Sequence, residues 1–83
     1  MYSHSALETA YCFFHQKQRV YQYSTMDWQR DDIECAIGAY VDGMDHELYG
    51  QLAQGQGDFL LSHTRFGDDL MLAVERLETM LSL

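Results

Sequence analysis

Apolar side chains recur every three or four residues along the last third of the chain. From position 63 the successive spacings are 3, 4, 3, 4 and 3, which place six side chains on one face of a helix: His63, Phe66, Leu70, Ala73, Leu77 and Met80. A second apolar row lies beside this one. The pattern predicts a helix over about residues 59–82, capped by Asp58 and continuous through Gly67, with a break at Gly67 as the alternative. Its wide apolar face requires contact with at least two other helices.

The same helical period appears in three earlier segments. It predicts helices over about residues 6–22 and 25–42, and a short one over about 46–54 that Asp45 caps. Proline is absent and the connections are short, which favours antiparallel neighbours. The predicted fold is therefore all-α: a small antiparallel helical bundle of three main helices and one short helix, forming a single domain over residues 1–83.

The charge balance excludes several classes of partner. Thirteen acidic and five basic side chains give a net charge of −8. Five scattered cations do not make a face for nucleic-acid phosphates or for an anionic membrane surface. No apolar run reaches the ~18 residues of a membrane span, and no signal peptide or disulfide framework is visible. A cytoplasmic protein with two buried free thiols is predicted, without nucleic-acid or membrane partners.

Negative charge is concentrated on the second predicted helix. Its acidic face consists of Asp27, Asp31, Asp32 and Glu34. Arg30 lies among these carboxylates at helical spacing, which is typical of an ordinary solvated surface. The functional alternative is an acidic helical antagonist, which masks a basic site on a nucleic-acid-binding or toxic partner protein.

Metal binding is a second alternative. Glu8, Cys12 and His15 lie at i, i+4 and i+7 on one side of the first predicted helix. They span too great a length for one ion, so Cys35 or His63 would have to complete a site in a metal- or cofactor-binding bundle. Because the recognised ligand spacings are missing, no metal and no cofactor are predicted.

The sequence also predicts that the protein is not an enzyme. Cys12 and His15 are three residues apart, but a helix interior does not activate a thiol, and no glycine-rich phosphate loop occurs. The lone His63 is expected to be a partly buried, hydrogen-bonded residue of the apolar seam.

Protein–protein contact is the predicted role. Six tyrosines, one tryptophan and five methionines are more than a core of this size shelters, and such residues are enriched at contact surfaces. The sequence therefore predicts a small acidic interaction or regulatory protein that self-associates, most simply as a homodimer. The predicted contact residues are Phe13, Tyr21, Trp28, Met71, Leu72 and Met80.

Overall fold

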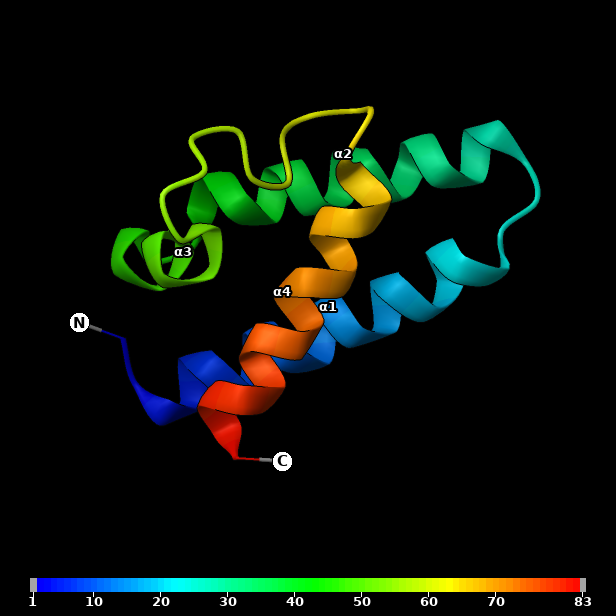
Figure 1. The fold of residues 1–83 in the computed structure, drawn as a ribbon. Helices are drawn as coiled ribbons and strands as arrows, with labels where there is room; N and C mark the ends of the chain where they lie inside the picture. The colour runs from blue at the N-terminus through cyan, green and yellow to red at the C-terminus, as the bar shows by residue number, and fades with distance from the viewer. Residues whose placement is uncertain (1, 83) are drawn as a thin grey trace.

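The computed structural model describes residues 2–82, which fold into four α-helices without a strand. The helices are α1 (His4–Tyr23), α2 (Asp27–Gly43), α3 (His46–Ala53) and α4 (Phe66–Leu81). The protein is thus a small all-α bundle of three main helices and one short helix, which confirms the predicted fold class (Figure 1). None of the four helices has the length and apolar character needed to cross a lipid bilayer.

Short polar residues set the helix starts. Ser3 caps α1 by accepting a hydrogen bond from the backbone N–H of Ala6 at 3.0 Å, so this helix begins two residues earlier than predicted. Asp45 caps α3 as predicted, because its carboxylate accepts hydrogen bonds from the N–H groups of Glu47 and Leu48. The α2 helix starts at Asp27, two residues later than predicted, and has Met26 at its cap position without a side-chain hydrogen bond.

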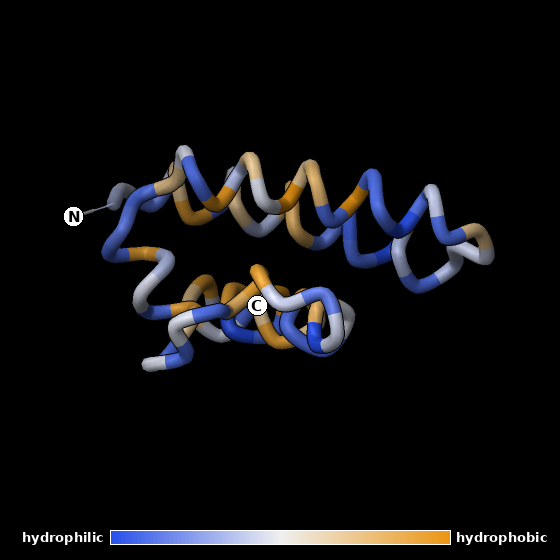
Figure 2. The backbone as a smooth tube through the Cα atoms, turned by 90° about the horizontal axis from the view of Figure 1, so that it is seen from above, coloured by the Kyte–Doolittle hydropathy of each residue, from blue (hydrophilic) through white to orange (hydrophobic). Residues whose placement is uncertain are grey.

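The helices are arranged in two layers. One layer is the antiparallel hairpin of α1 and α2, and the other contains the segment 54–65 and α4, which crosses in front of α1 (Figures 1 and 2). The closed end of the hairpin extends beyond the second layer, so α4 does not cover it (Figure 2). This overhang leaves the turn between α1 and α2 open to solvent on several sides.

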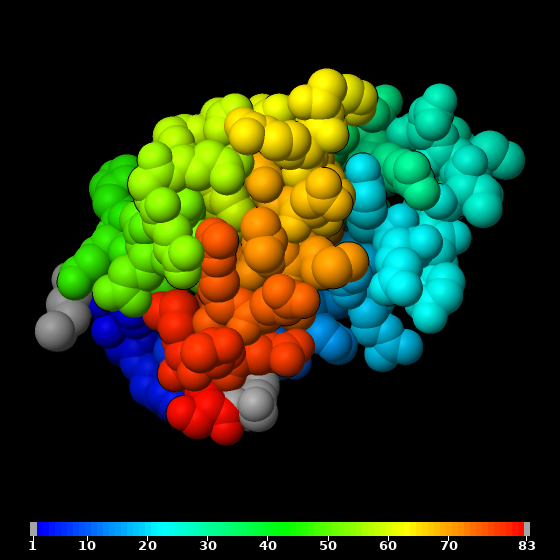
Figure 3. Space-filling view, viewed as in Figure 1, coloured from blue at the N-terminus to red at the C-terminus, as the bar shows by residue number. Residues whose placement is uncertain are grey.

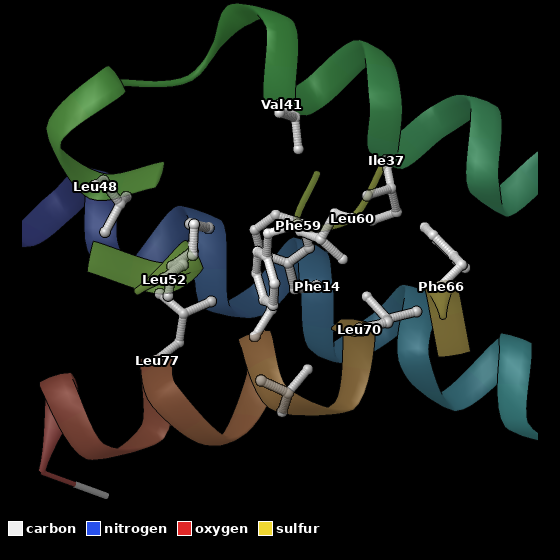
Figure 4. Close-up of a cluster of buried hydrophobic side chains, with 14 of the residues drawn as sticks. Phe14, Ile37, Val41, Leu48, Leu52, Phe59, Leu60, Phe66, Leu70 and Leu77 are labelled. Carbon is white, nitrogen blue, oxygen red and sulfur yellow. The ribbon is translucent and has the colours of Figure 1, made fainter. Parts of the chain in front are cut away.

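Both layers contribute to one apolar core. Fully buried side chains from every helix and from the 54–65 segment meet there (Figure 4). The largest of these are Phe14, Phe59, Phe66, Ile37, Leu48, Leu52, Leu70 and Leu77. Four of the six buried α4 residues are seam positions that the helical period predicted: Phe66, Leu70, Ala73 and Leu77. The other two are Val74, which belongs to the second apolar row, and Asp69, which the pattern did not place in the core.

The prediction of a helix from residue 59 is wrong, because α4 begins at Phe66 and residues 54–65 form a loop. Asp69, only 3% exposed, lies in the first turns of α4 and accepts a hydrogen bond from the backbone N–H of Leu60 at 3.0 Å. Leu60 adopts a left-handed conformation (φ 64°), which no continuous helix allows. The loop thereby inserts both Phe59 and Leu60 into the core.

The loop also changes the roles of two predicted helix residues. Asp58 caps no helix and instead pairs with Arg65, whose guanidinium lowers the pKa of the Asp58 carboxyl. His63 is exposed and lies outside the apolar seam, contrary to the prediction that it is partly buried. Its predicted hydrogen bond does form, to Glu34 on α2.

Candidate functional site

The closed end of the α1–α2 hairpin carries most of the exposed apolar surface. We call residues 17–32 the hairpin tip. Six large apolar side chains are exposed in the part of the chain that the structure describes. Four of them lie inside the hairpin tip, in the nine residues from 20 to 28. These four are Val20 (51% exposed), Tyr23 (74%), Met26 (55%) and Trp28 (63%). Figure 3 shows the hairpin tip projecting from the molecule on the right.

A tight connection holds the hairpin tip in shape. The buried Ser24 ends α1. Its hydroxyl donates a hydrogen bond to the carbonyl oxygen of Val20 at 2.6 Å, and its backbone N–H donates one to the carbonyl oxygen of Tyr21. Met26 then occupies the cap position of α2, where serine, threonine, aspartate or asparagine is favoured. An exposed apolar side chain at a cap position does not help the helix, so it is available for contact with another surface.

One side of the hairpin tip is hollowed between the two helix ends. The hollow has a volume of about 400 Å³ and is open to solvent. It is lined by Arg19, Val20, Tyr23, Ser24 and Gln29. The depression is shallow, with apolar surface from Val20 and Tyr23 and polar groups from the other three residues.

A second, acidic hollow shares no lining residue with the first and reaches the 54–65 loop at His63. Its volume is about 360 Å³. It is lined by Tyr21, Asp27, Arg30, Asp31, Glu34 and His63. Three of the four predicted acidic-face residues thus converge, whereas Asp32 is exposed outside this hollow. The guanidinium of Arg30 lies 5.1 Å from the centre of the Tyr21 ring and partly balances the negative charge.

His63 joins the loop to α2 through this acidic hollow. Its Nδ1 atom lies 2.9 Å from a carboxylate oxygen of Glu34. The hydrogen bond and charge of Glu34 raise the pKa of His63 above its ordinary value of 6.5, and Asp31 and Asp27 add to this effect. Possible ligand atoms of Asp31, Glu34 and His63 lie within 4.8 Å of one another, the one such group within residues 2–82. Exposed carboxylates commonly lie this close without an ion, so we assign the group an electrostatic role.

We expect the pKa of His63 to fall toward its ordinary value in Glu34→Gln. Because the pKa is raised in the folded protein, the pair contributes its full stability below the ordinary histidine pKa. That contribution is lost as the pH rises through the raised pKa of His63. An NMR titration of the ring resonances measures the shift, with Glu75→Gln on α4 as the control. Equal pKa values for His63 in both variants would show that Glu34 does not hold it.

The six predicted contact residues do not form one surface. Trp28 and Tyr21 both belong to the hairpin tip, but only Trp28 is exposed there, and Met71 is exposed on α4, away from the tip. Four of the six are partly buried and packed against the core: Phe13, Tyr21, Leu72 and Met80. Phe13, for example, stacks on Tyr40 with ring centroids 4.4 Å apart. Whether any of the six contacts a partner stays a prediction.

Sequence reasoning missed three residues of the hairpin tip: Val20, Tyr23 and Met26. The signal available in the sequence was their position on both sides of the predicted turn at residues 22–25. The helical period alone did not separate them from core residues, because Val20 and Tyr21 are neighbours in sequence and only Tyr21 packs against Phe66.

The alternative metal ligands do not converge into one group in the described part of the chain, although Glu8 and Cys12 line a common depression. Glu8 pairs with His4, and His15 lies against the Tyr11 ring. Cys12 and Cys35 are both exposed, which corrects the prediction of buried thiols. Among the described residues, the converging group contains His63 but none of the other four candidate ligands: Glu8, Cys12, His15 and Cys35.

Comparison with protein-family models, with curated proteins and with solved structures finds no match to this chain. Its function is therefore inferred from its own geometry.

Proposed function

We propose that this is a cytoplasmic protein-interaction protein of regulatory type, without catalytic activity, which binds its partner through the hairpin tip. The observation that carries the proposal is the gathering of four of the six exposed large apolar side chains within nine residues. Exposed apolar residues scattered singly need no explanation, whereas a gathered patch marks a contact site.

The residue types and the area of the patch support this role. Tryptophan and tyrosine are enriched among residues that dominate binding energy. At 63% and 74% exposure, Trp28 and Tyr23 together offer roughly 200–350 Å² of surface to a partner. Val20 and Met26 add further apolar surface, at 51% and 55% exposure. For comparison, the largest apolar patch on a typical monomer covers about 300–600 Å².

Affinity capture tests the proposal. The tagged chain is incubated with a native lysate that also contains its untagged copy. The wild type is expected to retain at least one protein that the double variant Tyr23→Ser, Trp28→Ser loses. The control is Leu61→Ser, Met71→Ser, which alters two exposed apolar residues outside the hairpin tip. Equal retention by the tip variant and the wild type would overturn the proposal.

The acidic hollow favours one second candidate function, an antagonist that masks a basic site on a nucleic-acid-binding or toxic protein. Asp27, Asp31 and Glu34 surround a 360 Å³ depression into which a lysine or arginine side chain can reach. Binding of this kind weakens steeply as salt concentration rises, whereas binding through the apolar patch persists. Loss of a captured partner in Asp27→Asn, Asp31→Asn but not in the tip variant would favour the antagonist.

A further inference from the structure

We propose that the surface covering the hairpin tip is the hairpin tip of a second copy of this chain, related to the first by a two-fold axis. This inference rests on the proposed function and names its partner. Two-fold contact requires a patch that is complementary to itself. The hairpin tip meets this requirement in charge, and it carries both an exposed tryptophan and a shallow hollow.

The hairpin tip is the electrically neutral part of an acidic protein. It contains three of the five cations of the chain, Lys17, Arg19 and Arg30, together with three carboxylates, so its net charge is zero. The remainder of the chain carries the whole net charge of −8. Two copies therefore meet at their tips without net repulsion between the contacting surfaces.

The position of the tip also separates the acidic parts of the two copies. The hairpin tip is at one end of the molecule, whose longest extent is 36 Å (Figure 1). Charges in water are largely screened beyond a Debye length of about 8–10 Å. Tip-to-tip contact hence places most of the carboxylates of one copy beyond the screening distance from those of the other.

Each helix end presents one aromatic and one charged side chain at i, i+4 spacing. Arg19 and Tyr23 share a face of α1, and Trp28 and Asp32 share a face of α2. All four side chains are exposed. Within residues 2–82, neither Arg19 nor Asp32 takes part in an ion pair, so both charges are available to a second copy.

A two-fold axis between the tips brings the end of α1 in one copy against the start of α2 in the other. The same contact forms a second time with the two copies exchanged. In this arrangement Trp28 of each copy lies over the shallow 400 Å³ hollow of the other, beside Tyr23. Arg19, which lines that hollow, faces Asp32 of the incoming helix. Both contacts form twice, aromatic against aromatic and cation against carboxylate.

The area of the patch sets the expected strength of the dimer. Stable interfaces bury about 800 Å² on each partner, and smaller ones are weak or transient. An apolar patch of about 300–600 Å² is smaller than this. We therefore expect a dissociation constant on the order of micromolar.

Sedimentation velocity tests the dimer, and Trp28, the one tryptophan of the chain, reports on the contact. We expect the wild type to shift from monomer to dimer between low micromolar and near-millimolar concentration. Tryptophan emission should shift to shorter wavelength over the same range. Trp28→Ser is expected to weaken the dimer roughly a thousandfold, because the loss of about thirtyfold that is typical of one anchor residue occurs in both copies. The control Leu61→Ser, Met71→Ser should dimerise like the wild type.

A charge exchange tests the orientation. Arg19→Glu and Asp32→Arg should each weaken self-association, because each variant places like charges together twice. An equimolar mixture of the two restores both opposite-charge contacts, so we expect it to form a heterodimer more strongly than either variant forms a homodimer. Circular dichroism confirms that the variants are folded, which is expected because both side chains are exposed.

The outcomes separate this inference from the proposed function. A wild-type protein that stays monomeric at every concentration overturns the dimer. If the tip-dependent capture of another protein still occurs, the proposed function stands with a different partner. A dimer that Trp28→Ser leaves intact overturns the inference in a different way, because the contact then lies elsewhere. A charge-exchange mixture that associates no better than its components overturns the two-fold arrangement.

Discussion

Replacing Phe14 by alanine is expected to lower the free energy of unfolding by about 3–5 kcal/mol. Phe14 is completely buried between the two layers, and its ring makes edge-to-face contacts with Phe13 and Tyr40 at centroid distances of 5.9 and 5.3 Å. The substitution removes the apolar surface of the ring and leaves a cavity that surrounding helices fill only in part. An 83-residue domain has a total stability of roughly 4–12 kcal/mol, so the variant loses much of it.

Urea denaturation followed by circular dichroism measures this loss. The control is Tyr23→Ala on the same helix, where the aromatic side chain is 74% exposed. A substitution at such a position is expected to change the free energy of unfolding by about 0.5 kcal/mol or less. If the two variants were equally stable, Phe14 would not occupy the centre of the core.

Replacing Asp69 by alanine is expected to lower the free energy of unfolding by about 1–3 kcal/mol. The Asp69 carboxylate accepts hydrogen bonds from the backbone N–H of Leu60 at 3.0 Å and from the side-chain amide of Gln56 at 3.2 Å. Alanine leaves the Leu60 N–H buried without this acceptor, and an unsatisfied buried donor costs its desolvation energy. Because this bond holds the 54–65 loop against α4, hydrogen exchange at the Leu60 amide should accelerate.

Asp68→Ala is the matched control, because Asp68 precedes Asp69 in α4 and is exposed. It removes only a favourable charge near the helix start, worth about 0.3–1 kcal/mol. Asp69→Asn keeps one acceptor oxygen and should fall between the two alanine variants. Unchanged stability of Asp69→Ala, with the Leu60 amide still protected, would contradict the role given to this carboxylate.

Local sequence patterns were enough to predict the fold class. The period of three and four residues identifies the buried face of α4 from Phe66 onward, since a helix in contact with a core repeats its apolar positions at that interval. Asp45 was recognisable as a cap because its carboxylate bonds to N–H groups only two and three residues away. Interactions over such short distances along the chain depend little on the rest of the molecule.

The 54–65 loop was not predictable in this way. Phe59 and Leu60 continue the apolar period of α4, and local propensity alone favours a longer helix. They are buried from a loop because Asp69 captures the Leu60 N–H and because Tyr49 of α3 donates its hydroxyl to the carbonyl oxygen of Phe59 at 2.7 Å. The first bond joins the loop to α4 and the second joins it to α3, so no pattern within the segment signals either of them.

The candidate site, too, could be predicted from the sequence only in part. The acidic character of α2 and the surplus of aromatic residues are properties of composition, which any arrangement of the chain preserves. The exposure of Val20, Tyr23, Met26 and Trp28 depends on how far α4 extends along the hairpin, and the meeting of His63 with Glu34 depends on the path of the loop. Both are set by packing between segments distant in sequence, where burial of the whole core outweighs the preferences of any single segment.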